Sequence, residues 1–234
     1  MIIGIITARE GSKGIANKNL ADLGGKPLIE YTFEAAQECT GLDRVFLTTD
    51  SKSIIQLAKS KYSRIEVPFI RPPELASDTT SHVQVVNHLL TELTKSENLS
   101  PDAFVLFQPT SPFRAVKEIE QAILMFRQKG LDSLLGVAKA MHHPADYVWR
   151  LPGETGFREV FERPPTLRRQ DLPEVFFITG SLFICNCKWY WAQQRFYDRS
   201  SHLFQMSDET LLDIDSPFDL QLAQGYLLVS HRNG

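Results

Sequence analysis

The sequence has no apolar run long enough to cross a bilayer and no signal-peptide pattern before its first apolar segment. It also has no excess of positive charge: 25 Lys and Arg stand against 28 Asp and Glu, a net charge of −3, which argues against a general nucleic-acid binder. Its three cysteines, Cys39, Cys185 and Cys187, are an odd number and do not suit a disulfide framework. These absences predict a cytoplasmic protein with free thiols that binds neither membranes nor nucleic acids.

Two common nucleotide-binding patterns, G-x-x-x-x-G-K-[ST] and G-x-G-x-x-G, are also missing. Instead, residues 8–19 form a glycine-rich, cationic run directly after the apolar segment 2–6, which we expect to be a buried strand. The run contains Arg9, Gly11, Lys13, Gly14 and Lys18. Glycines let a backbone approach phosphate oxygens, and cations neutralise those oxygens. The run therefore predicts a phosphate-binding loop, with a solvated basic surface loop as the alternative.

Apolar, strand-like segments alternate with amphipathic segments along most of the chain. The expected strands include residues 45–49, 103–107 and 134–137, and helical stripes follow at residues 27–36, 83–93 and 116–126. This alternation predicts an α/β fold, with a mostly parallel, nucleotide-binding (Rossmann-like) sheet flanked by helices on both faces.

The pattern breaks at residues 141–173, which contain five prolines and several large apolar side chains. We expect an α/β core made of residues 1–140 and 174–234, with residues 141–173 forming an excursion from it. Trp149, Phe157 and Phe161 in the excursion would need covering, so the segment predicts contact with a second subunit.

Two aspartates near the C-terminus are candidate metal ligands. Asp213 and Asp215 are two residues apart in an expected extended segment, so their carboxylates project to one face. Mg²⁺ is commonly bound by one or two carboxylates together with phosphate oxygens. The alternative is that Asp215 or Ser216 only caps the final helix.

Three further runs contain candidate binding residues. Gln108 follows the strand 103–107, at the kind of strand end where α/β sheets bind ligands. Arg71 precedes a cluster of hydroxyl residues, and it could touch a base or a ribose. Within the excursion, Arg169 could grip a carboxylate, whereas His143 could serve in packing. Each run could instead be an ordinary connection or a solvated charge cluster.

Taken in order, these runs resemble the acylneuraminate cytidylyltransferase family, which comprises the CMP-sialic acid synthetases and their relatives acting on legionaminic acid and other nonulosonates. The resemblance extends from residue 1 to about residue 229. The matching motifs are A-R-x-G-S-K-G-I-x-x-K-N, T-T-D, R-P-x-E-L-A-S-D-T, Q-P-T-S-P-x-R, H-H-P, R-Q-x-L-P, T-G-S-L-F-I and D-I-D-S-P-x-D-L.

The resemblance implies transfer of CMP from CTP to the anomeric hydroxyl of a nonulosonic acid, with release of pyrophosphate and dependence on Mg²⁺. The nucleotide-binding residues it implies are Arg9, Gly11, Ser12, Lys13, Lys18, Asn19, Arg71 and Thr80. The implied sugar-binding residues are Gln108, His143 and Arg169. Asp213 and Asp215 are the implied metal ligands, and together with Arg9, Lys13 and Lys18 they form the catalytic set. The resemblance also implies a homodimer whose excursion reaches the site of the other subunit.

Several positions depart from the sialic acid enzymes: Glu10, His82, Asp146 and the run of residues 177–180 that begins with Phe177. His82 stands where a small hydroxyl residue is often found near the nucleotide, so the resemblance does not fix how this position contacts the base. The changes at Asp146 and at Phe177 lie on the implied sugar side, and they predict a sugar other than N-acetylneuraminate, such as legionaminic acid or another di-N-acyl nonulosonate. Two alternatives remain: a nucleotidyltransferase for a Kdo-like sugar acid or with another nucleotide, and a non-catalytic nucleotide- or sugar-binding protein.

Overall fold

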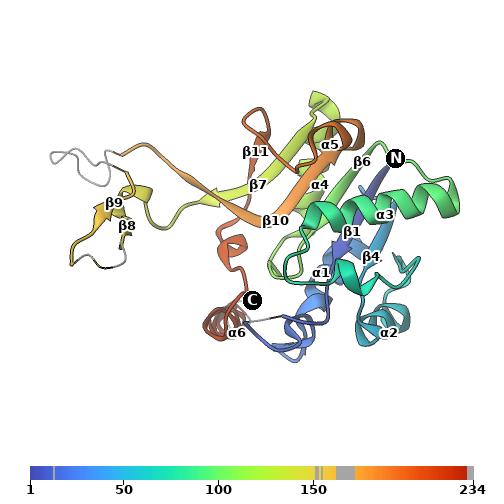
Figure 1. The fold of residues 1–234 in the computed structure, drawn as a ribbon, viewed down its shortest axis with the longest axis horizontal. Helices are drawn as coiled ribbons and strands as arrows, with labels where there is room; N and C mark the ends of the chain where they lie inside the picture. Colours follow the sequence, from blue (N-terminus) through green and yellow to red (C-terminus); the bar gives the residue numbers. More distant parts are fainter. Residues whose placement is uncertain (13, 151–152, 154, 162–171, 231–234) are drawn as a thin grey trace.

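A seven-stranded sheet forms the centre of the computed structural model, which describes residues 1–12, 14–150, 153, 155–161 and 172–230 (Figure 1). The strand order is β11-β7-β10-β6-β1-β4-β5. The strands are β1 Ile2–Thr7, β4 Arg44–Thr48, β5 Ile65–Glu66, β6 Ala103–Phe107, β7 Ser133–Lys139, β10 Phe176–Asn186 and β11 His202–Gln205. Only β10 runs antiparallel to its neighbours in this sheet. The expected mostly parallel α/β fold is therefore confirmed.

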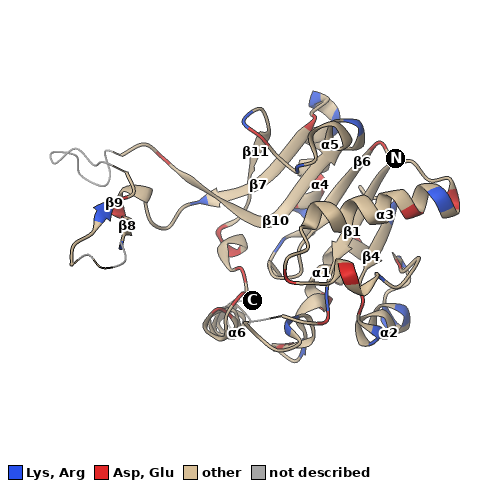
Figure 2. Cartoon of the chain, viewed as in Figure 1, with Lys and Arg blue, Asp and Glu red and all other residues tan. Residues whose placement is uncertain are grey.

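Helices pack on both faces of the sheet (Figure 1). They are α1 Leu28–Glu38, α2 Lys52–Lys61, α3 His82–Glu97, α4 Val116–Lys129, α5 Cys187–Gln193 and α6 Pro217–Ser230. Successive strand residues face opposite sides, so β1 contributes Ile6 to a core with α1 and α4, and Ile5 to a second core with α3. No charged residue lies in β1 or β6 (Figure 2), as expected for strands buried on both faces. No helix within the described residues is both long and apolar enough to span a membrane.

The strands β7 and β10 continue from the sheet into a projecting arm, which ends in the small hairpin of β8 and β9 (Figure 1). The hairpin strands are β8 Val148–Trp149 and β9 Arg158–Glu159. The apolar runs at residues 175–178 and 182–184 predict two separate strands. This prediction is wrong, because β10 is continuous through an irregularity in its pairing with β7. Gly180 has a φ of +70° at this irregularity, a conformation that glycine adopts without strain.

The carboxyl ends of β1, β4 and β6 lie at one edge of the sheet, since these strands run parallel. The backbone N–H of Ile214 donates to the carbonyl oxygen of Thr110 at 2.8 Å, which ties the segment before α6 to the turn after β6. A short antiparallel pair, β2 Asp22–Leu23 with β3 Lys26–Pro27, follows the N-terminal loop. The edge thus collects loops from the N-terminus, the middle and the C-terminus of the chain.

Candidate active site

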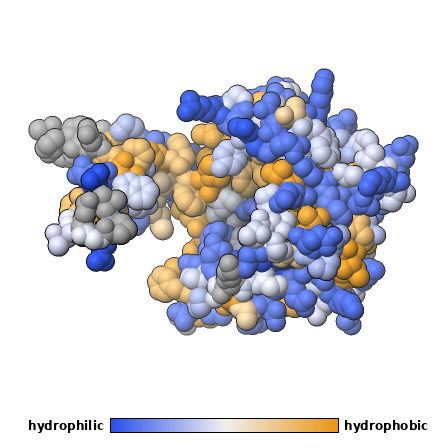
Figure 3. Space-filling view, viewed as in Figure 1, coloured by the Kyte–Doolittle hydropathy of each residue, from blue (hydrophilic) through white to orange (hydrophobic). Residues whose placement is uncertain are grey.

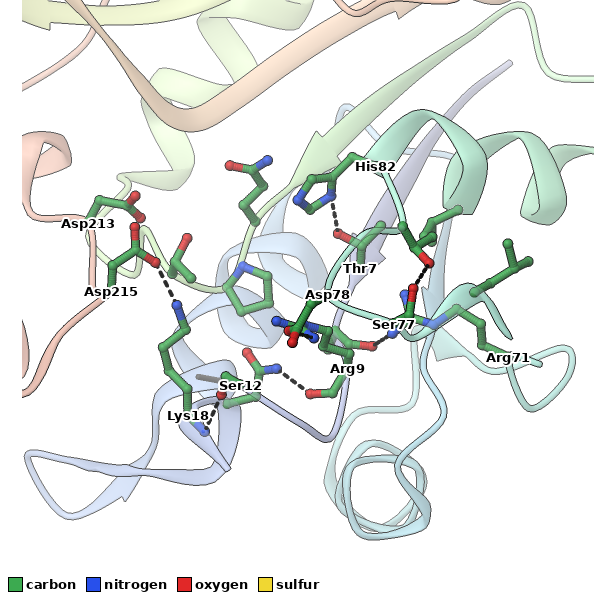
Figure 4. A pocket seen from close by; sticks show the side chains of 18 residues that line it. Thr7, Arg9, Ser12, Lys18, Arg71, Ser77, Asp78, His82, Asp213 and Asp215 are labelled. Carbon is green, nitrogen blue, oxygen red and sulfur yellow. Dashed lines mark hydrogen bonds and ion pairs between the residues drawn. The ribbon is translucent and has the colours of Figure 1, made fainter. Parts of the chain in front are cut away.

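A cavity of about 450 Å³ opens at this edge of the sheet (Figure 4). The predicted site residues that line it are Arg9, Ser12, Lys18, Asn19, Arg71, Thr80, Gln108, Asp213 and Asp215. Gly11 is exposed and is not part of the lining, and His143 lies on the arm, where its Nδ1 accepts a hydrogen bond from the N–H of Ala145. Lys13 and Arg169 lie outside the described residues. Nine of the predicted residues therefore converge on one cavity, and His143 does not belong to it in the single chain.

One side of the cavity carries an ion pair between the two ends of the chain. Lys18 Nζ lies 2.7 Å from Asp215 Oδ1 (Figure 4). The Lys18 side chain is 13% exposed, whereas the Asp215 carboxylate is 74% exposed, so the lysine is held in place and the aspartate faces solvent. The backbone N–H of Lys18 donates to Ser12 Oγ at 3.2 Å, and Ser12 Oγ donates to the carbonyl oxygen of Ile15 at 2.7 Å. The loop thus fixes a cation beside a solvent-facing carboxylate.

Arg9 and Arg71 lie across the cavity from Asp213 and Asp215 (Figure 4), and each is paired with another aspartate. Arg9 Nη1 is 2.5 Å from Asp78 Oδ1. Arg71, only 3% exposed, donates from Nη2 to the carbonyl oxygen of Ala8 and, at 3.3 Å, to Asp50 Oδ1. Burial lowers the pKa of Arg71 and Asp50 opposes this, and an arginine stays charged at neutral pH under such a shift. The cavity therefore presents two guanidinium groups to an anionic ligand.

His82, the first residue of α3, also lines the cavity. Its Nδ1 lies 3.2 Å from Thr7 Oγ1 at the end of β1 (Figure 4). The imidazole is open to solvent within the cavity, yet the protein atoms around it and the charges of Arg71 and Arg9 lower its pKa. A neutral imidazole donates through one nitrogen and accepts through the other. With Nδ1 engaged by Thr7, the second ring nitrogen is available to a polar ligand.

The two aspartates of residues 213–215 are not needed to cap α6. Ser216 Oγ accepts from the N–H of Asp219 at 3.3 Å, and Asp219 accepts from the N–H of Ser216 at 2.7 Å and of Asp215 at 3.1 Å. This reciprocal arrangement is a capping box. Ser216 is thus the helix cap, and the side chains of Asp213 and Asp215 both line the cavity.

The carboxylates of Asp213 and Asp215 fit Mg²⁺, for which they would supply some of the oxygen ligands. In the described parts of the chain, no three His, Cys, Asp or Glu side chains come together to enclose a metal ion. Mg²⁺ does not require such an enclosure, because it usually keeps several waters and takes its remaining oxygens from substrate phosphates. Asp213 is oriented by Ser111, whose Oγ lies 3.1 Å from its Oδ1.

Comparison with known proteins gives the family. A family model described as cytidylyltransferase matches residues 3–171. The chain belongs to the cytidylyltransferase family. It is 30% identical to CMP-N,N′-diacetyllegionaminic acid synthase of Legionella pneumophila over 95% of this chain and 94% of the relative. It is 29% identical to pseudaminic acid cytidylyltransferase of Campylobacter jejuni over 98% of this chain and 97% of the relative. The resemblance found in the sequence is confirmed.

A third relative is longer. The chain is 29% identical to N-acylneuraminate cytidylyltransferase of Streptococcus agalactiae over 98% of this chain but only 54% of that protein, so it spans about half the length of the first curated relatives it matches.

Two solved structures share the fold of this chain. CMP:2-keto-3-deoxy-manno-octonic acid synthetase in complex with CTP has a TM-score of 0.67, with 15% identity over 98% of this chain and 99% of that chain. The 4-diphosphocytidyl-2C-methyl-D-erythritol synthase of Anaerococcus prevotii has a TM-score of 0.65, with 13% identity over 97% and 96%. At such low identity, the two likenesses establish the fold alone.

The site also contains residues that the sequence did not single out. Asp50 accepts hydrogen bonds from Arg71 and from the N–H of Glu10, and Asp78 pairs with Arg9. Asp50 ends the T-T-D motif, whose first threonine is the last residue of β4, so its place just beyond a strand end was a signal that could have identified it. Asp78 lies in a hydroxyl-rich run in which no spacing distinguishes a site residue from a helix-capping one.

Gly14 is the point at which the N-terminal loop meets the C-terminal segment. A Cβ at Gly14 would overlap the carbonyl oxygen of Asp215, whereas a Cβ at Gly11 would meet nothing within 4 Å. We expect Gly14→Ala to lower the free energy of unfolding by about 1–3 kcal/mol, as overpacking typically does. Gly11→Ala, the matched control, should stay within about 0.5 kcal/mol of the wild type. Urea unfolding of both variants measures this, and equal stabilities would contradict the close approach.

Proposed function

We propose that the protein transfers CMP from CTP to the anomeric hydroxyl of a nonulosonic acid and releases pyrophosphate, in a reaction that depends on Mg²⁺. One observation carries the proposal: in a chain of the cytidylyltransferase family, Arg9 and Lys18 line the same cavity as Asp213 and Asp215. Cations neutralise a triphosphate, and paired carboxylates hold a divalent ion against its oxygens. A site with both suits phosphoryl transfer.

The orientation of CTP follows from the two ends of the cavity. The triphosphate would lie between Lys18 and Arg9, where the positive charge is concentrated. The base and ribose would lie toward Arg71 and His82, next to the apolar side chains of Leu75 and Val85. A neutral His82 would offer its free ring nitrogen to the nucleotide, in a position where the related sialic acid enzymes often carry a small hydroxyl residue.

The protein's own groups would act by positioning and by charge. The anomeric hydroxyl would attack the α-phosphorus in line, with pyrophosphate leaving on the opposite side. Lys18 would exchange its contact with Asp215 for a phosphate oxygen, and Arg9 would do the same with respect to Asp78. Such preorganised charges stabilise the charge that develops in the transition state. When bound at Asp213 and Asp215, Mg²⁺ would supply further positive charge and lower the pKa of a coordinated hydroxyl.

We propose a di-N-acyl nonulosonate as the sugar, with legionaminic acid as the first candidate. Among the relatives that match over nearly their full length, one is named for legionaminic acid and one for pseudaminic acid. Gln108 would contact the sugar from the end of β6. The side chain of Gln108 lies against Gly180, whose lack of a side chain leaves room for it, since a Cβ at that glycine would lie 2.9 Å from Gln108 Oε1.

We also propose that the protein is a cytoplasmic homodimer in which a second copy covers the arm and the sheet beside it. Trp149, Phe157 and Phe161 on the arm are 60%, 66% and 55% exposed. Apolar residues also gather where the arm joins the core (Figure 3). Monomers rarely expose so much contiguous apolar surface. His143, on the arm, would then lie near the sugar or at the contact between the subunits.

The nucleotide is tested by thermal unfolding with CTP, UTP, GTP or ATP in the presence of Mg²⁺. A ligand at 100 times its Kd stabilises a protein by about 2.7 kcal/mol, which for a chain of this size corresponds to a Tm rise of roughly 5–10 °C. We expect this rise with CTP and a much smaller one with the other three nucleotides. A larger rise with UTP, GTP or ATP would contradict the assignment of CTP.

The reaction is tested by pyrophosphate release with CTP and legionaminic, pseudaminic, N-acetylneuraminic or Kdo-type acids. We expect the fastest release with a di-N-acyl nonulosonate. A preference for N-acetylneuraminic acid would overturn the sugar assignment. Stabilisation by CTP without pyrophosphate release from any of these acids would indicate a non-catalytic binding protein.

A further inference from the structure

Arg114 is a buried cation directly behind the cavity. It lies between β6 and α4 and is 7% exposed. Its Nη2 donates to the carbonyl oxygen of Gln108 at 2.5 Å and to that of Ser111. Within the described residues, Nε and Nη1 have no hydrogen-bond partner. Burying a charge without full pairing costs stability, so an apolar residue would fill this space more favourably. Packing alone therefore does not account for Arg114.

The turn that Arg114 holds carries groups from both halves of the proposed site. Gln108 begins the turn and lines the cavity. Ser111, which is fully buried, has its Oγ 3.1 Å from Asp213 Oδ1 and 3.1 Å from the carbonyl oxygen of Thr179. Arg114 is thus bonded to Gln108, the proposed sugar-binding residue, and to Ser111, which contacts the proposed metal ligand Asp213. A shift of the turn would therefore have two effects at once: it would move Gln108, and it would break the contact of Ser111 that orients Asp213.

The charge of Arg114 also acts on this region. Burial lowers the pKa of Arg114 to about 9, and the Asp213 carboxylate acts in the opposite direction. The guanidinium therefore stays protonated at neutral pH. A neutral side chain of similar volume would lose both the donors to the turn and the positive charge that faces Asp213.

We propose that Arg114 is a positioning residue that sets Gln108 and, through the Ser111 hydroxyl, Asp213 at the same time. The proposal rests on the proposed function, in which these two residues serve the sugar and the metal. Arg114 itself does not line the cavity. It acts by holding the backbone of the turn in the one arrangement that presents both groups to the cavity.

Arg114→Met tests the proposal in the full chain. Loss of residues that orient metal ligands typically costs about 10- to 100-fold in activity or metal affinity. We expect a fall in kcat of this size and a raised KM for the sugar. The KM for CTP should change little, because Arg9, Lys18 and Arg71 stay in place. Arg114→Lys keeps the charge and a donor, so it should recover a large part of the loss.

Metal binding gives a readout that does not depend on turnover. Mn²⁺, which takes the same hard oxygen ligands as Mg²⁺, is titrated against the nucleotide-free protein and followed by the electron paramagnetic resonance of the free ion. We expect weaker Mn²⁺ binding in Arg114→Met. Ser111→Ala, a small change that should fold, removes the hydroxyl contacts with Asp213 and with the carbonyl oxygen of Thr179 but leaves the bonds of Arg114 to the turn in place. It should weaken Mn²⁺ binding while leaving the sugar KM near its wild-type value.

The control is Arg127→Met, which makes the same change at an arginine on α4 whose side chain is 51% exposed. It should leave kcat, the sugar KM and Mn²⁺ binding unchanged.

The proposal is overturned if Arg114→Met keeps the kcat and the sugar KM of the wild type. It is also overturned if the losses in Arg114→Met only follow its unfolded fraction and are absent at temperatures well below its Tm. Unchanged Mn²⁺ binding in Ser111→Ala would overturn the link to Asp213. If the wild type releases no pyrophosphate, the proposed function fails, whereas the Mn²⁺ titrations still decide whether Arg114 sets Asp213.

Discussion

Asp215→Asn is expected to lower the turnover of the proposed reaction by about 10²- to 10³-fold, the size of loss seen when one preorganised charge-stabilising group is removed from an active site. The carboxylate of Asp215 faces solvent in the cavity and is not used to cap α6. Asparagine has nearly the same shape but supplies only a neutral oxygen, so it would be a much weaker Mg²⁺ ligand. The loss should therefore appear in kcat.

The same substitution should hardly change stability. The ion pair between Lys18 and Asp215 is largely exposed on the aspartate side, and such pairs contribute about 0–1 kcal/mol. Asp22→Asn, at an exposed carboxylate in β2 outside the cavity, is the matched control and should leave both kcat and Tm unchanged. Near-normal turnover of Asp215→Asn at saturating Mg²⁺ would show that Asp215 is not a metal ligand.

Binding of CTP in EDTA separates the metal role of Asp215 from its contact with Lys18. In the free protein the Asp215 carboxylate is paired with the Lys18 ammonium group, so an incoming phosphate of CTP must displace it. Without metal, Asp215→Asn should bind CTP at least as tightly as the wild type, because it frees that cation and removes a negative charge from the cavity. Weaker binding in EDTA would mean that Asp215 mainly orients Lys18.

Those parts of the site that depend on local sequence could be predicted. The apolar residues of β1 followed by glycines and cations indicate a strand and a phosphate loop, and the spacing of Asp213 and Asp215 places both carboxylates on one face. The order of the motifs then named the family, which implied the contacts of Arg71 and Gln108. The strand, the loop and the aspartate pair follow from the geometry of the backbone alone, whereas the contacts of Arg71 and Gln108 with a ligand are implied by the resemblance and stay predictions.

Contacts between distant segments could not be predicted in this way. Nothing in the loop indicates that Gly14 meets the carbonyl oxygen of Asp215, or that Lys18 pairs with that residue. Arg114 was part of a quoted motif, yet its burial and its bonds to the turn depend on how β6, α4 and β10 pack. The edge strand β11 was missed for the same reason, because its four residues form a strand only by pairing with β7. Tertiary packing decides such features.

Leu203→Asp is expected to convert the proposed homodimer into monomers. Leu203 lies on the edge strand β11 and is 53% exposed; with Phe176, Ile178 and Tyr197 it lines an open apolar hollow of about 790 Å³ beside the arm. We expect a second copy to cover this surface, because it continues the exposed apolar surface of the arm (Figure 3). Burying a carboxylate there would cost several kcal/mol of desolvation, which Arg195 and Arg199, also in the lining, would offset only in part, so dimerisation should weaken about 10²-fold.

Leu124 offers a closely matched control for this substitution. It is 54% exposed, nearly the same as Leu203, but it lies on α4 outside the hollow. Light scattering at micromolar concentration should show a dimer for the wild type and for Leu124→Asp, and a monomer for Leu203→Asp. Since a carboxylate replaces leucine in both variants, a difference between them reports on the surface rather than on the change in net charge. If Leu203→Asp stays dimeric, the subunits meet elsewhere, and the apolar hollow must then be covered by something other than a second copy.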